Sequence, residues 1–139
     1  MTPEQVAQVQ ASFQKVAPIA DQAAALFYAR LFETAPDLRA LFTGNMEVQG
    51  QKLMAAIATV VDGLGEIETV APAVRDLAKR HVVYGVRPEH YKLVGGALLW
   101  TLEQGLGADF TPAVRAAWTE AYGALSEMMI AAAYPAGRR

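Results

Sequence analysis

The sequence predicts an all-α protein, and three observations support this fold class. Apolar residues recur at three- and four-residue spacing along nearly the whole chain, as in amphipathic helices packed on a common core. Prolines stand where helices begin, as in Thr2-Pro3 and Thr111-Pro112. No segment has a convincing strand pattern, and no repeat or linker separates parts of the chain. The 139 residues therefore predict one domain, 1–139, built as a helical bundle.

Each predicted helix has a start signal and an apolar stripe. Thr2 and Gln5 have the spacing of a capping box at the start of the first helix. The second helix begins near Pro18, and its apolar stripe turns Tyr28 inward. On the helix that begins at Met46, Gln49 is the one polar residue of an otherwise apolar face. The predicted segments are 3–16, about 18–34, 36–42, 46–64, about 72–84, about 88–106 and 112–133, with a frayed tail from about 135.

Glycines and polar turns mark the predicted ends of these segments. The turn Thr43-Gly44-Asn45 closes the short piece after Pro36, and the Gly63/Gly65 break leads through a looser stretch to the helix near Pro72. Gly105 and Gly107 form a helix stop, since they follow no strand and make no GxGxxG. Gly95-Gly96 lies in mid-helix, where each glycine costs about 1 kcal/mol against alanine, and it therefore predicts a close helix crossing.

Composition excludes several classes of function. The net charge is −2, and Lys and Arg cluster only at 79–80 and 138–139. The sequence therefore predicts no basic surface for nucleic-acid binding. The absence of cysteine excludes disulfides, zinc-thiolate sites and cysteine nucleophiles, and it agrees with a reducing cytoplasm. No apolar run approaches the length of a membrane span, and the polar N-terminus lacks the features of a secretion signal. We expect a cytoplasmic protein that binds neither membrane nor nucleic acid.

Three polar residues on apolar helical faces are the candidate functional groups: Tyr28, Gln49 and His81. His81 lies about one turn before a helix end at which Gly85 can supply a left-handed stop, and Pro88 can open the next helix. Each residue also has an ordinary structural interpretation, because lone histidines and tyrosines more often complete a core and glutamines are usually solvated.

Familiar enzyme motifs are missing from the sequence. It has no GxSxG, HExxH or Walker loop, and no paired carboxylates on an apolar helical face. His81 and His90 lie on either side of a proline corner with no cysteine and no obvious third ligand, so we do not expect a structural zinc site.

A longer pattern runs in order along nearly the whole chain. It consists of Phe27-Tyr28, Leu31-Phe32, Pro36, Leu41-Phe42, Gln49, Leu53, Lys79-Arg80-His81, Gly85-Val86, His90-Tyr91, Val94-Gly95, Ala117-Trp118 and Ala121-Tyr122-Gly123. This pattern resembles that of bacterial single-domain globins related to the globin domain of flavohaemoglobins, including the Vitreoscilla and Hell's Gate types.

The resemblance implies a globin fold, a three-over-three helical sandwich around haem b. It implies that His81 is the proximal iron ligand, with its other ring nitrogen on a carbonyl near Leu77. Tyr28 and Gln49 match the distal pair that holds bound dioxygen. The remaining positions that match haem contacts are Phe42 against the haem face, Leu53 over the iron, Val86, Tyr91 and Val94 along the pocket wall, and Lys52 and Arg80 as candidates for the propionates.

The sequence departs from the family pattern in two respects. Related globins place a glutamate late in the last helix, near the tyrosine that Tyr91 matches, whereas this chain has Ala131-Ala132-Ala133. Tyr91 is then expected to be a core or pocket-wall residue. No flavin or nicotinamide domain follows the globin part, so we expect that turnover would need a separate reductase.

The resemblance leaves three functional hypotheses. The first is a haem b protein that reversibly binds dioxygen and other diatomic ligands such as NO and CO, for oxygen transport or storage. The second is an enzyme, a nitric oxide dioxygenase that detoxifies NO with an external reductase. The third is a haem-free or sensory globin that acts through partner contacts, against which the lack of an output domain argues. Either a monomer or a small homo-oligomer fits these hypotheses. In all of them His90 has a packing or surface role.

Overall fold

The structure, a computed structural model, describes residues 1–42, 44–83 and 87–133, and contains only helices and turns in these ranges. Short 3-10 turns, labelled η, connect several of the α-helices. The predicted stop at Gly85 and the predicted tail from residue 135 lie outside the described residues. The elements in order are α1 (Pro3–Val16), η1 (Ala17–Ile19), α2 (Ala20–Thr34), η2 (Pro36–Leu41), α3 (Met46–Asp62), η3 (Leu64–Glu66), α4 (Ile67–Val83), α5 (His90–Leu106), η4 (Gly107–Asp109) and α6 (Pro112–Ala133).

Local sequence explains several helix ends. Thr2 and Gln5 form the predicted capping box at the start of α1. The Asn45 side chain caps α3 by accepting from the backbone N–H groups of Glu47 and Val48. Gly107 ends α5 with a φ of 55°, a left-handed conformation that glycine adopts without strain, and this confirms the predicted stop.

Two prolines do not mark helix starts as predicted. α4 begins at Ile67, so Pro72 lies inside the helix, and the expected loose stretch before Pro72 is helical. Pro72 cannot donate to the carbonyl of Glu68 one turn back, but both residues are exposed, so water can take that bond. Pro88 lies in a turn, and α5 begins two residues later at His90.

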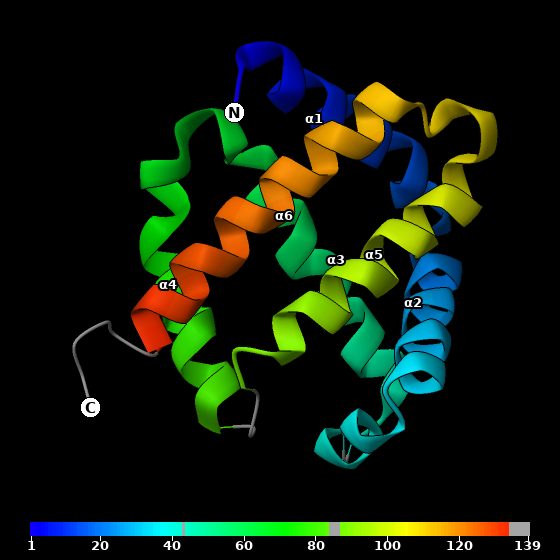
Figure 1. Ribbon diagram of the computed structural model, residues 1–139, viewed down its shortest axis with the longest axis vertical. Helices are drawn as coiled ribbons and strands as arrows, with labels where there is room; N and C mark the ends of the chain where they lie inside the picture. Colours follow the sequence, from blue (N-terminus) through cyan, green and yellow to red (C-terminus); the bar gives the residue numbers. More distant parts are fainter. Residues whose placement is uncertain (43, 84–86, 134–139) are drawn as a thin grey trace.

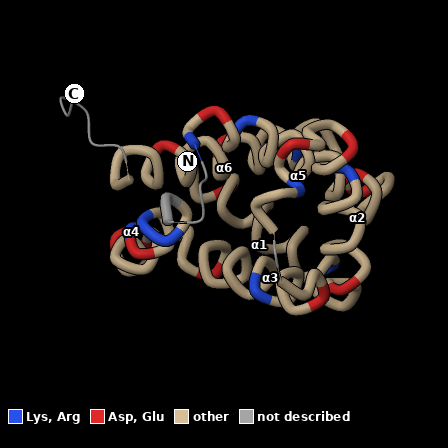
Figure 2. Tube along the Cα trace, turned by 90° about the horizontal axis from the view of Figure 1, so that it is seen from below, with Lys and Arg blue, Asp and Glu red and all other residues tan. Residues whose placement is uncertain are grey.

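The helices pack in two layers. Figure 1 shows α6 crossing the front of the molecule from upper right to lower left, with α5 and α2 to its right. Seen from below in Figure 2, α6, α5 and α2 form one layer and α4 and α3 the other. Contacts link α2 with α5, α5 with α6, and α3 with α4, while α1 contacts α6, α3 and α5. This arrangement confirms the all-α fold class that the sequence predicts.

The crossing of α5 and α6 occurs at one of the two mid-helix glycines. A Cβ atom on Gly95 would lie 2.6 Å from Cε2 of Tyr122, whereas a Cβ on Gly96 would meet nothing within 4 Å. The predicted close crossing is therefore confirmed at Gly95, and Gly96 faces open space. No helix among the described residues is long and apolar enough to cross a membrane. Basic and acidic residues are interspersed along the trace in the view of Figure 2.

Candidate functional site

Tyr28 lies at the centre of an aromatic cluster. It is on the inner face of α2 and only 7% exposed, which confirms the predicted inward direction. Its ring makes an edge contact with Phe27 at 5.0 Å between centroids and stacks on Phe32 at 5.8 Å. Phe42, which follows η2, closes the cluster with edge contacts to both Tyr28 and Phe32. The hydroxyl of Tyr28 is therefore held on a rigid, largely apolar support.

Gln49 reaches Tyr28 because α2 and α3 cross closely. Gly50 lies so near α2 that a Cβ there would be 2.9 Å from the Cβ of Ala24. This approach brings the first turn of α3, with the half-buried Gln49, beside Tyr28. Burial raises the pKa of the Tyr28 hydroxyl, and the smaller opposing effect is hydrogen bonding with the Gln49 side chain. Tyr28 thus stays protonated and can donate a hydrogen bond.

Three of the other candidates border the same cluster. Phe42 follows η2, Leu53 lies on α3 and Val94 lies on α5. All three are partly buried and pack against the buried core around Tyr28 and Leu31. The structure therefore gathers Tyr28, Phe42, Leu53 and Val94 into one apolar region, with Gln49 as a polar neighbour.

Two spaces adjoin this region. A groove of about 350 Å³ opens to the surface between α2, η2 and α3, with Tyr28 and Phe32 among its lining residues and Asp21, Arg39 and Glu47 around it. A small space of about 20 Å³ lies inside the bundle, lined mainly by apolar side chains that include Phe27 and Leu53. A space of this size corresponds to about one water-sized probe.

His81 has a fixed tautomer. It is half-buried in the last turns of α4, and its Nδ1 lies 2.8 Å from the carbonyl oxygen of Leu77, one turn earlier. A carbonyl can only accept, so Nδ1 carries the proton and Nε2 carries the lone pair. Burial lowers the pKa of His81, against the smaller effect of the Leu77 hydrogen bond, and the nearby Arg80 charge lowers it further. The neutral imidazole is therefore favoured.

Tyr91 packs beside His81. The two rings lie 6.4 Å apart between centroids and 23° from parallel. Tyr91 is 7% exposed and belongs to a core cluster with Val74, Ala78 and Met129. Because Tyr91 and Val94 are one turn apart on α5, that helix borders both the His81 region and the Tyr28 region.

The remaining candidates lie at the surface or outside the described residues. Lys52 is exposed on α3, and Arg80 is exposed on α4, where it pairs with Asp76 at 3.6 Å. Val86 lies outside the described residues. His90 opens α5, and its Nδ1 accepts from the backbone N–H of Arg87 at 3.0 Å, so it stabilises a turn.

Sequence reasoning missed the role of Tyr122, which it named only among the residues that match the family pattern. The Tyr122 hydroxyl donates to the backbone carbonyl of Tyr91 at 2.5 Å. The two residues are 31 positions apart, and the acceptor is a backbone atom. No sequence signal could have found the contact, apart from the glycine at position 95, which hinted at a close crossing.

The fold and the site define an all-α protein in which one helix borders both a histidine of fixed tautomer and a buried aromatic cluster. The family model for globins matches residues 25–129, which include all of these side chains. Flavohemoproteins of Bordetella parapertussis, Rhizobium meliloti and Bacillus subtilis are 36%, 32% and 30% identical over 107, 106 and 107 residues. These alignments cover 75%, 74% and 75% of this chain but only 27%, 26% and 27% of the relatives, so the chain spans about a quarter of their length.

The chain belongs to the globin family. Its resemblance to globins is thereby confirmed, and so is the all-α globin fold. Globins hold haem through a histidine and bind diatomic ligands at the haem iron, so the chain is a haem globin at this level of description. The residues present fit such a group, because the neutral His81 with its proton on Nδ1 is a suitable metal ligand and α5 connects its surroundings to the apolar region around Tyr28.

Proposed function

We propose that this globin reversibly binds dioxygen at haem b, with His81 as the iron ligand and Tyr28 and Gln49 as hydrogen-bond donors to the bound ligand. The observation on which the proposal rests is the bond between His81 Nδ1 and the Leu77 carbonyl. It leaves the lone pair on Nε2, and such a bond also fixes the angle of a ligating ring. The lowered pKa of His81 favours the neutral form that can bind a metal.

Haem supplies the iron that holds the diatomic ligand. The chain's own contribution is the polarity of the pocket around that ligand. The Tyr28 hydroxyl stays protonated because burial raises its pKa, and Gln49 can donate from its amide. Dioxygen held at such an iron would be strongly polarised and would accept these bonds, whereas carbon monoxide would be much less polarised. Tyr28 and Gln49 should therefore slow the release of dioxygen selectively.

The other candidate residues have supporting roles in this proposal. Phe42, Leu53 and Val94 keep water from the ligand, since all three pack in the apolar region around Tyr28. Tyr91 forms the wall beside His81. We assign Lys52 and Arg80 to the haem propionates, because both are exposed charges beside pocket residues on α3 and α4. The assignment of Val86 to the pocket wall rests on its match to the family pattern alone.

The relation to flavohemoproteins favours a second candidate function, nitric oxide dioxygenation. In that reaction NO, dioxygen and one electron give nitrate, so turnover needs an electron donor. We infer that a separate reductase would supply the electron. The test is sustained NO consumption by the purified globin with a supplied reductase and reductant. Consumption that stops after about one equivalent would leave dioxygen binding as the function and exclude the enzyme.

The experiment that tests the main proposal compares the two histidines. The reduced, deoxygenated protein should give the absorption spectrum of five-coordinate ferrous haem. His81→Ala should eliminate this spectrum, and added imidazole should restore it. His90→Ala is the matched control, because His90 lies nine positions away and Nδ1 of His90 is already engaged with Arg87. Retention of the spectrum in His81→Ala, or its loss in His90→Ala, would refute the assignment of His81.

A further inference from the structure

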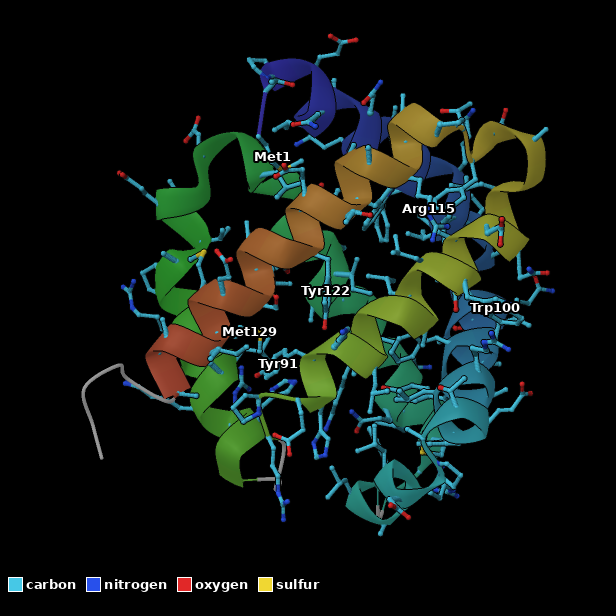
Figure 3. The ribbon with its side chains drawn as sticks, viewed as in Figure 1. Met1, Tyr91, Trp100, Arg115, Tyr122 and Met129 are labelled. Carbon is cyan, nitrogen blue, oxygen red and sulfur yellow. The ribbon has the colours of Figure 1, made fainter. Side chains whose placement is uncertain are left out.

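The first turn of α5 is tied to α6 through Tyr122. The hydroxyl of Tyr122 donates to the carbonyl oxygen of Tyr91, and this contact bridges residues 31 positions apart. A carbonyl has two lone pairs, so this oxygen can also accept its usual bond within α5. Figure 3 shows Tyr122 pointing from α6 toward the start of α5, where Tyr91 is labelled. The contact thus fixes one end of the Tyr122 side chain.

The ring of Tyr122 also packs against α5, at Gly95. The Tyr122 ring lies where a Cβ on Gly95 would be 2.6 Å from Cε2 and 2.9 Å from Cδ2. Only glycine at this position lets the ring lie so close to the α5 backbone. Burial also raises the pKa of Tyr122 far above its usual value, with a further contribution from Tyr91, so its hydroxyl remains a donor. Tyr122 therefore holds α5 at both Tyr91 and Gly95.

The position of Tyr91 bears on the orientation of His81. The hydrogen bond from Nδ1 to Leu77 fixes the tautomer of His81, but one bond in the plane of a ring leaves that ring able to tilt about the bond. The nearly parallel Tyr91 ring, 23° from the imidazole plane, limits this tilt. The stacking holds only while the first turn of α5 stays in place.

We propose that Tyr122 is a positioning residue for the iron ligand. It anchors the backbone of Tyr91, and the Tyr91 ring then restrains the His81 imidazole. This inference rests on the proposed role of His81. It adds Tyr122 to Leu77 and Tyr91 as residues that hold the His81 ring in place. It also gives the close crossing at Gly95 a functional reason, because a larger residue would displace the Tyr122 ring.

The test is Tyr122→Phe in the haem-loaded protein, because phenylalanine keeps the ring and removes the donor. The readout is the iron–histidine stretching band in the resonance Raman spectrum of the reduced, ligand-free form. We expect the band to shift and broaden, because the imidazole gains freedom to tilt. Gly95→Ala, which displaces the ring and keeps the hydroxyl, should also shift the band.

The matched control is Ser12→Ala, which removes the acceptor of the Trp118 Nε1 hydrogen bond at 2.8 Å. Trp118 lies one turn before Tyr122 on α6 and is also an aromatic donor to another helix, but it packs in a different cluster from Tyr91. The control should lower stability and leave the band in place. An equal shift in Ser12→Ala would mean general loosening and would overturn the proposal.

Other outcomes separate this inference from the proposed function. An unchanged band in Tyr122→Phe refutes the positioning role, and if that variant does not hold haem, an unchanged band in Gly95→Ala refutes it. A wild-type protein without an iron–histidine band, or one whose band survives in His81→Ala, refutes the ligand assignment itself.

Discussion

The two adjacent glycines of α5 allow a paired prediction about the close helix crossing. Alanine at either position should gain about 0.5–1 kcal/mol from the backbone, because glycine is a poor residue in a helix interior. At Gly96 nothing lies within 4 Å of the new methyl group, so Gly96→Ala should be stabilising. At Gly95 the methyl would lie 2.6 Å from an aromatic carbon of Tyr122, and overpacking of this kind costs roughly 1–3 kcal/mol.

The difference between the two variants isolates the overpacking cost, because the backbone gain is common to both. Unfolding entropy of about 2.1 cal/mol/K per residue converts 1–3 kcal/mol into a Tm difference of roughly 3–10 °C for a chain of this size. Urea unfolding and thermal melts of both variants, with haem loading held equal, measure it. If Gly95→Ala is as stable as Gly96→Ala, the close contact between Tyr122 and α5 is not a constraint, and the reasoning fails.

Two further predictions concern the buried tyrosines. Tyr28→Phe should speed dioxygen release by roughly tenfold to a hundredfold, since a hydrogen bond to a charged acceptor contributes about 1.5–3 kcal/mol, and Gln49→Leu should have a smaller or different effect. Stopped-flow release rates unchanged in both variants would refute the distal assignment. Because burial raises the pKa of Tyr28 and Tyr122, the folded protein should ionise fewer than its five tyrosines at about pH 11, and stability should fall as pH rises past about 10. Ultraviolet titration in which all five ionise together while the fold is intact would contradict this.

Helix starts were predictable where a proline coincided with a capping side chain. At Thr2-Pro3 and Thr111-Pro112 the side chain and the ring act together within one turn, and both starts are found where expected. Pro72 has no such cap before it. Because Pro72 and Glu68 are exposed, water can take the bond that the proline cannot make, and the helix extends past a residue that the sequence signal treats as a break.

The candidate site was likewise predictable where its contacts lie within one helix, and not where they join two helices. Tyr28 could be placed inward from its apolar stripe, and α2 alone brings Phe27 and Phe32 against it. The approach of Gln49 depends on the Gly50 crossing with Ala24, and the anchoring of Tyr91 depends on a contact from α6. Such contacts depend on the packing angle of two helices, which side-chain spacing within one helix does not determine.

The two histidines show why residue type alone was insufficient to assign the site. In the sequence each stands near the proline corner between α4 and α5. In the structure their Nδ1 atoms have opposite partners: a carbonyl that accepts at His81 and a backbone N–H that donates at His90. In their neutral forms the protons are therefore on opposite ring nitrogens. Nδ1 of His90 stabilises its own turn, whereas Nδ1 of His81 donates within α4, and the His81 ring lies beside Tyr91, whose backbone Tyr122 holds. The hydrogen bond of His81 within α4 and that of His90 within a turn thus distinguish the proposed iron ligand from the structural histidine.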